Sequence, residues 1–502
     1  MAEFSWLDLL ASHGKDAPLL VVGQRRWRAT EIADELRALQ PRLAESNVVA
    51  VLADNGPGWV MADLGTQVAG KVHLPLPAFF TQAQLRHALE LSAADTVLTD
   101  TPERIGALDL GFCHTGRWQG FYWMRRIVPA VSLPEGTAKI SYTSGSTGAP
   151  KGVCLSREGL LDTASAVGEA TSALALECHL AALPLGLLLE NVAGVYAALL
   201  RGIPVHLPSL GDIGWQGSAG FDPAQLDAVV RASGAASLIL VPELLKVWSL
   251  WLAARGRMAS ERLRFVAVGG ARVAPGLLEL ARARGIPAYQ GYGFTEAGSV
   301  VSLNLPGDDG DDAGAPLPHV RLSVREGEGE VVVQARAFLG YVGGERAASG
   351  AFASGDLGHL DDRGHLQLDG RRGNLLITSF GRNVSPEWVE SLLLADACVA
   401  QAVVVGDGRP QLAALIVPSP GTDPAALAAL IDRVNAALPD YARVRHWLAV
   451  PPFTVENGLA TGNGRPVRTR VLEHHSTQID ALYVASSNET KANEKEANDV
   501  LL

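Results

Sequence analysis

Short β-rich segments alternate with longer amphipathic segments from Leu7 to about Arg371. Residues 48–53, 237–241 and 264–270 have the length and β-branched content of buried strands, whereas residues 30–45 carry apolar side chains at helical spacing. Strands that alternate with helices are typical of parallel sheets covered by helices. The pattern therefore predicts a large N-terminal α/β domain.

The pattern changes in the last third of the chain. Between Gly314 and Gly364 short alternating segments are separated by Gly and Asp turns, which predicts a small antiparallel or barrel-like subdomain. Strands and helices then follow one another as in a compact α+β domain, and the final residues have little apolar content, as in a disordered tail. The expected divisions are 1–371 for the large domain, 372–475 for the small domain and 476–502 for the tail.

Length, composition and charge exclude several classes of protein. The 502 residues exceed a single hydrophobic core, and a content of 48% hydrophobic and 19% charged residues is that of a folded globular protein. The net charge is −11 and there is no long basic run, so the chain lacks the surface that binds nucleic-acid phosphates. We expect several domains and no nucleic-acid partner.

Cysteine usage and the apolar segments favour a cytoplasmic protein. The four cysteines show no CxxC spacing, which argues against a disulfide framework and against a zinc site. The first residues do not combine the basic and apolar regions of a signal peptide. The longest apolar region, Leu183 to Leu207, is interrupted by Glu190, Arg201 and two prolines. We expect no membrane span, because a span needs roughly 20 mostly apolar residues.

A glycine- and hydroxyl-rich segment, ISYTSGSTGAPKG, occupies residues 140–152. Glycines let backbone N–H groups turn toward an anion, hydroxyls add donors, and a lysine adds a positive charge. The spacing is not that of a Walker A loop. Taken alone, the composition is also compatible with a flexible surface turn. The candidate phosphate-binding residues are Thr143, Ser144, Gly145, Ser146, Thr147, Gly148 and Lys151.

The segment Tyr142 to Gly152 closely resembles the phosphate loop of the adenylate-forming superfamily, which includes the acyl-CoA synthetases. Further segments similar to motifs of that family follow in order: VGGA at 268–271, GYGFTE at 291–296, SGDLG at 354–358 and a Gly-Arg pair at 370–371. The resemblance covers about residues 20 to 470. It implies an α/β large domain, made of two α/β subdomains plus a distorted β-barrel, and a small mobile α+β C-terminal domain.

The resemblance also implies a two-step reaction. A carboxylate attacks the α-phosphate of ATP to form acyl-AMP and pyrophosphate, and a thiol or amine then displaces AMP. The implied cofactors are ATP, Mg²⁺ and coenzyme A or a carrier-protein phosphopantetheine. Lys151 and Thr295 would act at the phosphates, and Glu296 would bind the metal. The implied nucleotide-binding residues of these later motifs are Gly270, Ala271, Tyr292, Asp356 and Arg371.

The segment LPLGLLLENVAG at 183–194 resembles the part of long-chain acyl-CoA synthetases that varies with the acid. Leu189 stands where an amino-acid-activating relative would carry an aspartate, and an unpaired buried ammonium is unfavourable. A free amino acid is therefore disfavoured as substrate, unless Glu190 turns toward its ammonium group. We expect a fatty or other hydrophobic acid first and an aryl acid second, although such leucines could also simply pack the core. The predicted acyl-pocket residues are Leu187, Leu189, Glu190 and Gly298.

Three further positions concern the C-terminal domain. The resemblance places Gly373 at the hinge, where a charged residue is usual, and Gly381 beside the tunnel for the thiol arm. Arg465 stands where the family has a lysine that acts in the first step. The acceptor could be coenzyme A, an acyl carrier protein or an amine, and a nucleotide-binding homologue with impaired catalysis is the remaining alternative.

Overall fold

The computed structural model shows two compact units. The first comprises residues 1–354 with 358–368, and the second comprises residues 355–357 with 369–502. The sequence placed this division between residues 371 and 372. The structure describes residues 4–143, 150–216, 220–308, 310–344, 347, 351–380, 382–461 and 464–483. Among the helices of these residues, none has the length and apolar character that crossing a membrane requires.

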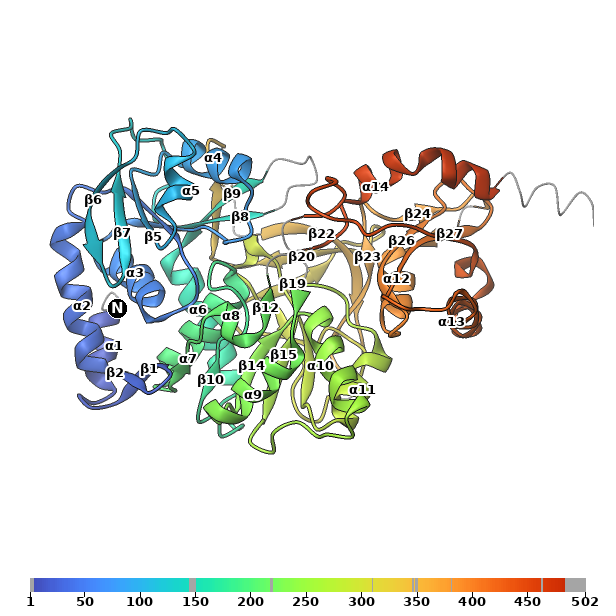
Figure 1. The fold of residues 1–502 in the computed structure, drawn as a ribbon, viewed down its shortest axis with the longest axis horizontal. Coiled ribbons are helices and arrows are strands. Elements are labelled where there is room, and N and C mark those ends of the chain that lie inside the picture. The colour runs from blue at the N-terminus through green and yellow to red at the C-terminus, as the bar shows by residue number, and fades with distance from the viewer. Residues whose placement is uncertain are drawn as a thin grey trace, which may run out of the picture. The chain divides into compact units, whose positions relative to one another are not determined.

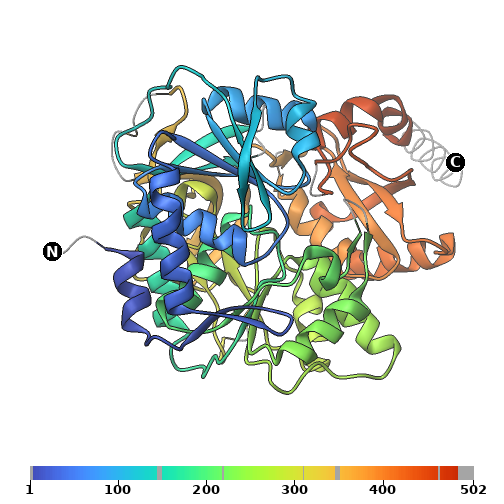
Figure 2. The same ribbon diagram turned by 60° about the vertical axis from the view of Figure 1, so that its left-hand side comes forward.

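One sheet of the first unit has eight strands, in the order β21-β9-β8-β4-β3-β5-β7-β6. Its centre is parallel, and every residue of β3 is buried, as expected for a strand covered on both faces. Helices α1 and α2, dark blue in Figure 2, pack against each other beside this sheet. The strands are β3 (Val48–Leu52), β4 (Val72–Pro75), β5 (Thr96–Thr99), β6 (Cys113–Trp118), β7 (Phe121–Arg125), β8 (Thr137–Thr143), β9 (Lys151–Ser156) and β21 (Phe338–Tyr341). The helices of this part of the chain are α1 (Trp6–Ser12) and α2 (Ala29–Arg42), which precede β3, and α3 (Pro57–Val68), α4 (Gln82–Leu91), α5 (Pro102–Gly106) and α6 (Arg157–Ala170).

A second sheet has nine strands, in the order β18-β17-β16-β15-β14-β10-β11-β1-β2. Helices α9, α10 and α11 lie over β14 and β15, shown in green in Figure 1. Its strands are β1 (Pro18–Val22), β2 (Arg25–Arg28), β10 (His179–Leu180), β11 (Val205–His206), β14 (Ser237–Leu240), β15 (Phe265–Val268), β16 (Ala288–Tyr292), β17 (Ser302–Leu303) and β18 (Ala315–Pro316). The connecting elements are the π-helix Leu189–Tyr196, α7 (Ala197–Leu200), α8 (Leu210–Ile213), α9 (Pro223–Ser233), α10 (Pro242–Ala254), α11 (Pro275–Ala283), the 3₁₀ helix Thr295–Ala297 and a small ribbon of β12 (Trp215–Gln216) and β13 (Gly220–Phe221).

The segment expected to form a distorted barrel contributes a four-stranded sheet, in the order β19-β20-β22-β23. The large sheets share one hydrophobic core, which includes Val49 of β3, Leu155 of β9 and Val205 of β11. The predicted fold class, a large α/β domain with a small C-terminal domain, is confirmed. The strands of the small sheet are β19 (Arg321–Val324), β20 (Glu330–Gln334), β22 (Ala351–Leu360) and β23 (Leu366–Arg371).

The second unit is built on a three-stranded sheet in which β27 pairs antiparallel with β26 and parallel with β28. Residues 476–483 are helical, and Tyr483 is buried and donates a hydrogen bond to the carbonyl oxygen of Gln411 at 3.0 Å. The prediction that a disordered tail begins at residue 476 is therefore wrong for these eight residues, because an apolar face packs on the sheet. Residues 484–502 lie outside the described part. The elements are β24 (Leu376–Ile377), β25 (Asn383–Val384), α12 (Pro386–Leu394), β26 (Val399–Val405), β27 (Leu412–Pro418), α13 (Pro424–Ala437), the 3₁₀ helix Asp440–Ala442, β28 (Val444–Ala449) and α14 (Arg468–His474).

A polar cluster lies inside the apolar core of the first unit. The Lys139 Nζ is 2.9 Å from Asp63 Oδ2, and both side chains have no exposed surface. Asp63 Oδ2 also accepts hydrogen bonds from Tyr196 Oη at 2.7 Å and from Asn191 Nδ2 at 2.8 Å. His73 Nε2 lies 3.7 Å from Asp63 Oδ1. Buried charges are tolerated when they are paired and hydrogen-bonded, as they are here.

The burial of His73 predicts a loss of stability in acid. Burial lowers the pKa of His73 to about 4, Asp63 opposes this shift and Lys139 adds to it. As the pH falls below about 6.5, the unfolded chain takes up this proton first, so the free energy of unfolding should decrease until about pH 4. We expect His73→Phe to reduce this slope by at most about 1.4 kcal/mol per pH unit. Urea unfolding of both proteins between pH 7 and pH 4 measures it, and identical slopes would contradict the assignment.

Candidate functional site

The predicted phosphate loop connects two adjacent, paired strands. Thr143 at the end of β8 is the direct partner of Lys151 at the start of β9, so the loop leaves and re-enters the sheet at neighbouring positions. His87 Nε2 donates to the carbonyl oxygen of Pro150 at 2.9 Å and anchors the returning end. Lys151 is exposed. The predicted residues Ser144, Gly145, Ser146, Thr147 and Gly148 lie outside the described residues.

The segment GYGFTE forms a tight turn after β16. A Cβ atom at Gly293 would overlap the carbonyl oxygen of Ser299, so only glycine fits where the chain folds back on itself. The following 3₁₀ helix presents Thr295 and Glu296, both half-buried. The turn therefore explains why the motif needs its glycine and how it brings two polar side chains to the surface.

Tyr341 joins two of the predicted catalytic residues. Its hydroxyl donates to Glu296 Oε1 at 2.9 Å, and the Lys151 ammonium lies 5.7 Å from the centre of its ring. Burial, with a further contribution from Glu296, raises the pKa of Tyr341, so the phenol keeps the proton that it donates. The sequence does not single out Tyr341, because no local pattern indicates that β21 pairs with β9.

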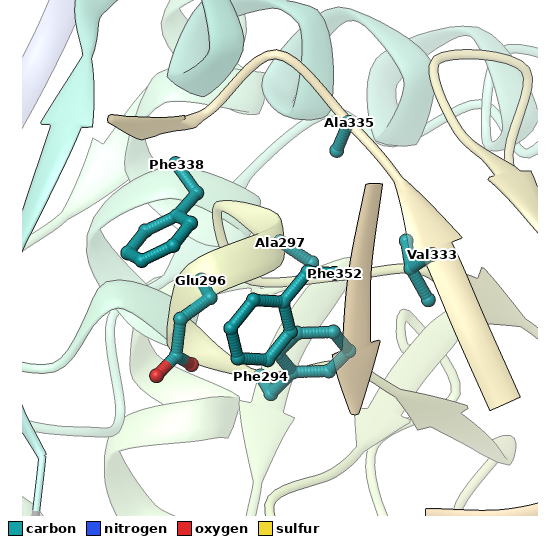
Figure 3. Close-up of a pocket in the computed structure, with 7 residues that line it drawn as sticks. All are labelled: Phe294, Glu296, Ala297, Val333, Ala335, Phe338 and Phe352. Atoms are coloured by element: carbon teal, nitrogen blue, oxygen red, sulfur yellow. The ribbon is translucent and has the colours of Figure 1, made fainter. Parts of the chain in front are cut away.

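Aromatic side chains surround the turn. Figure 3 shows the rings of Phe294, Phe338 and Phe352 around a small pocket, with the Glu296 carboxylate at one side. The ring centres of Phe294 and Phe352 are 5.7 Å apart, and those of Phe338 and Phe352 are 5.3 Å apart. Phe338 also contacts Tyr341 edge to face at 5.1 Å. The predicted adenine-side residue Tyr292 extends this cluster through a 6.0 Å contact with Phe294.

The predicted adenine segment and one predicted acyl-pocket residue lie together. Gly270 and Ala271 are exposed after β15, and Gly270 has a φ of +85°, a backbone conformation that favours glycine. A Cβ atom at the neighbouring Gly269 would lie 3.6 Å from Leu189 Cδ2 and 3.7 Å from the Gly291 carbonyl oxygen. Leu187 and Leu189 are half-buried. This placement is compatible with a site for a hydrophobic acid next to the nucleotide.

Two other predicted acyl-pocket residues lie in the interior. Glu190 has no exposed surface, and its oxygens are paired with His179 Nε2 at 2.8 Å and with the Leu183 N–H at 2.9 Å. A Cβ atom at Gly298 would lie 2.8 Å from Ala337 Cβ. In this structure Glu190 and Gly298 are covered by other parts of the chain, and their predicted place in the acyl pocket stays a prediction.

The second unit contains the other predicted site residues. Arg371 Nε lies 3.2 Å from Asp356 Oδ1, so the predicted ribose-binding carboxylate and the predicted hinge-side guanidinium are neighbours. Gly373 is exposed with open space around its Cα. Arg465 closes a turn in which its carbonyl oxygen accepts from the Thr461 N–H at 2.8 Å. Gly381 lies outside the described residues.

Family models match both parts of the chain. Residues 22–345 match the family described as AMP-binding enzyme, and residues 374–487 match the AMP-binding enzyme C-terminal domain. The chain belongs to the AMP-binding enzyme family. A 2-succinylbenzoate–CoA ligase of Bacillus cereus is 32% identical over 80% of this chain and 85% of its own length. The long-chain-fatty-acid–CoA ligase FadD15 of Mycobacterium bovis is 30% identical over 43% of this chain and 41% of its own length.

A solved relative shares the fold of this family member. The o-succinylbenzoate coenzyme A synthetase of Bacillus subtilis, in complex with ATP and magnesium ion, superposes with a TM-score of 0.73 at 21% identity and covers 93% of this chain and 98% of its own. The likeness to this structure bears on the fold, whereas the family models and the curated CoA ligases confirm the predicted superfamily and the predicted class of enzyme, an acid–thiol ligase.

The tight turn at Gly293 predicts that alanine destabilises the protein there but not at Gly276, where a side chain has room. Gly293→Ala should destabilise the first unit by about 1–3 kcal/mol or more, because the new methyl group meets a backbone oxygen. Gly276→Ala in α11 is the control, since nothing lies within 4 Å of a Cβ atom there, and it should stabilise by about 0.5–1 kcal/mol. Thermal unfolding followed by circular dichroism measures both. Equal effects of the two substitutions would show that the turn tolerates a side chain.

Proposed function

We propose that this enzyme activates a hydrophobic carboxylic acid with ATP and transfers the acyl group to the thiol of coenzyme A. The observation that carries the proposal is the contact of Tyr341 with both Glu296 and Lys151. It brings a carboxylate and an ammonium group, which are far apart in the sequence, to one end of the predicted phosphate loop. A site where a carboxylate attacks the triphosphate must hold several negative charges at once, which a cation, backbone N–H groups and a divalent metal can do.

The residues present fit a magnesium ion. Mg²⁺ in nucleotide sites is usually held by one or two carboxylates together with substrate phosphates, and Glu296 supplies one half-buried carboxylate. Within the described residues, no group of three acidic, histidine or cysteine side chains forms a separate metal cage. Glu296 would hold the ion, which would neutralise charge on the phosphates. Tyr341 would orient the Glu296 carboxylate through its hydrogen bond.

The remaining residues of the first unit would serve the nucleotide. Lys151 would face the phosphates beside the loop that includes Ser144 to Gly148, and Thr295 would donate to the α-phosphate. Gly270 and Ala271 would leave room for the adenine ring, which Tyr292 would contact with its flat face. The acid carboxylate would attack the α-phosphorus, and pyrophosphate would leave with the bridging oxygen.

The second unit would act in both steps. Asp356 would accept hydrogen bonds from the ribose hydroxyls, and Arg371 would stabilise negative charge beside it. Arg465 would supply a cation for the first step, as a planar guanidinium in place of an ammonium. Rotation of the C-terminal domain about Gly373 would change the enzyme from the conformation for the first step to that for the second. Gly381 would then leave space for the thiol arm.

The acid should have a hydrophobic body, because the half-buried side chains of Leu187 and Leu189 offer it only apolar surface. We place aryl acids ahead of fatty acids. The relative matched over most of its length is named for an aryl acid, whereas the fatty-acid ligase is matched over less than half of this chain. Coenzyme A is the favoured acceptor because the curated relatives are named as CoA ligases. A carrier-protein thiol or an amine is the alternative.

An acid panel tests the proposed function. The protein is incubated with ATP, Mg²⁺, coenzyme A and one of benzoate, anthranilate, 2-succinylbenzoate, octanoate or palmitate. We expect release of AMP and formation of the matching acyl-CoA, detected by mass spectrometry, for at least one aryl acid and at a lower rate for octanoate. Formation of acyl-AMP without acyl-CoA would contradict coenzyme A as the acceptor and would favour a carrier-protein thiol or an amine. Failure to form acyl-AMP from any acid would contradict the activity.

The metal assignment predicts graded magnesium requirements. Glu296→Gln removes a ligand charge and should raise the Mg²⁺ concentration for half-maximal adenylation about tenfold, whereas Tyr341→Phe should raise it only about threefold because the carboxylate remains. Tyr122→Phe, on β7 of the same sheet, is the matched control and should leave the titration unchanged. Pyrophosphate release at increasing Mg²⁺ measures the three variants. Titrations that coincide with that of the unaltered enzyme would remove Glu296 from the metal site.

A further inference from the structure

The π-helix Leu189–Tyr196 carries three buried polar side chains on an otherwise apolar segment. π-helical turns are rare and are frequent at functional sites, because the extra residue in each turn shifts the side chains that follow. Leu189, its first residue, is the side chain that lies against Gly269 at the proposed acid site. The register of this helix therefore decides where Leu189 points.

One end of the π-helix is held to the nine-stranded sheet. Glu190 Oε1 is 2.8 Å from His179 Nε2 on β10, and His179 Nδ1 is 3.1 Å from Ser237 Oγ on β14. The other carboxylate oxygen of Glu190 accepts the Leu183 N–H. A Cβ atom at Gly194, one turn further, would overlap both Glu190 and His179, so the helix lies directly on this pair.

The other anchor comes from the eight-stranded sheet. Asn191 accepts a hydrogen bond from the Lys139 Nζ and donates to Asp63 Oδ2, and the Tyr196 hydroxyl lies 3.0 Å from the same Nζ. Lys139 lies on β8, four residues before Thr143, where the predicted phosphate loop begins. The hydrogen bonds of Lys139 to Asn191 and Tyr196 thus connect the strand that leads into the loop with the helix that carries Leu189.

Stability alone does not explain a charged pair at this depth. Replacing a buried ion pair with well-packed apolar residues is often neutral or stabilising, whereas buried polar groups can specify one arrangement of the elements that they join. Here both charges and both polar partners converge on a single helix. A hydrophobic cluster in their place could pack with the helix in more than one register.

We propose that Lys139 is a positioning residue that acts through Asn191 to set the register of the π-helix, and thereby the place of Leu189 in the acid site. The proposal rests on the proposed function and adds to it a determinant of acid binding that lies outside the pocket. Lys139 does not touch the acid, and its effect reaches the site through the hydrogen bonds of Asn191 and Tyr196.

Asn191→Leu tests this inference, because it removes the Asn191 link between the helix and the Lys139–Asp63 pair while that pair and the Tyr196 hydroxyl remain. We expect the KM for the acid to rise by at least about fivefold, because the helix loses both hydrogen bonds of Asn191, and the KM for ATP to stay within about twofold. Benzoate and octanoate are the probes. Ser46→Ala is the matched control, since it removes a buried hydrogen bond to Thr96 in the same unit without contact to the π-helix, and both KM values should remain unchanged.

Two further measurements keep the test decisive. Tyr196→Phe removes one hydroxyl and keeps the ring, so it replaces Asn191→Leu if that variant does not fold, and it should show the same direction of change. Amide hydrogen exchange should become faster over residues 183–196 in either variant and stay unchanged over α10. Unchanged exchange there, or an equal rise of both KM values, would overturn the inference. An unaltered enzyme that activates no acid would instead refute the proposed function, and the exchange experiment would still decide the role of Lys139.

Discussion

The charge pair of Lys139 and Asp63 is the constraint around which the first unit is organised. Neither side chain reaches solvent, so each charge must be satisfied by groups that the fold brings to it. Those groups come from helix α3, strand β8 and the π-helix, and they meet only when both large sheets are in place. The polar cluster therefore selects one arrangement among the many that an apolar core of this size could adopt.

The candidate site depends on the same long-range arrangement at its surface. β9 receives the chain from the predicted phosphate loop on one side and pairs with β21 on the other, and this second pairing puts Tyr341 beside Lys151 and Glu296. The Gly293 turn brings Glu296 to the meeting point, because the backbone can fold back there only without a side chain. A loop, a turn and an edge strand thus supply the proposed phosphate and metal chemistry, while the rigid sheets hold them.

In the proposed mechanism the acid site and the phosphate loop are connected through buried hydrogen bonds in the interior. The predicted acyl-pocket residue Glu190 is buried, and it supports the segment that carries Leu187 and Leu189. The buried polar residues of this segment would therefore hold the backbone that presents the apolar side chains of the proposed acid site. This arrangement lets the exposed face remain hydrophobic, as the proposed acid requires, without leaving a buried charge unpaired.

The sequence by itself determined the features that depend on neighbouring residues: the alternating strands and helices, the glycine-rich loop, the turn motif and the family. Each of these follows from the spacing of apolar residues, from short motifs or from the backbone freedom of glycine, all of which can be recognised within short segments of the sequence. Only the tertiary structure decided the contacts of Tyr341 with Glu296 and Lys151, the burial of Glu190 and Gly298, and the helix at residues 476–483. The physical reason is that burial and pairing depend on partners that are distant in sequence, and a polar residue next to a predicted pocket looks the same whether it faces the ligand or the core.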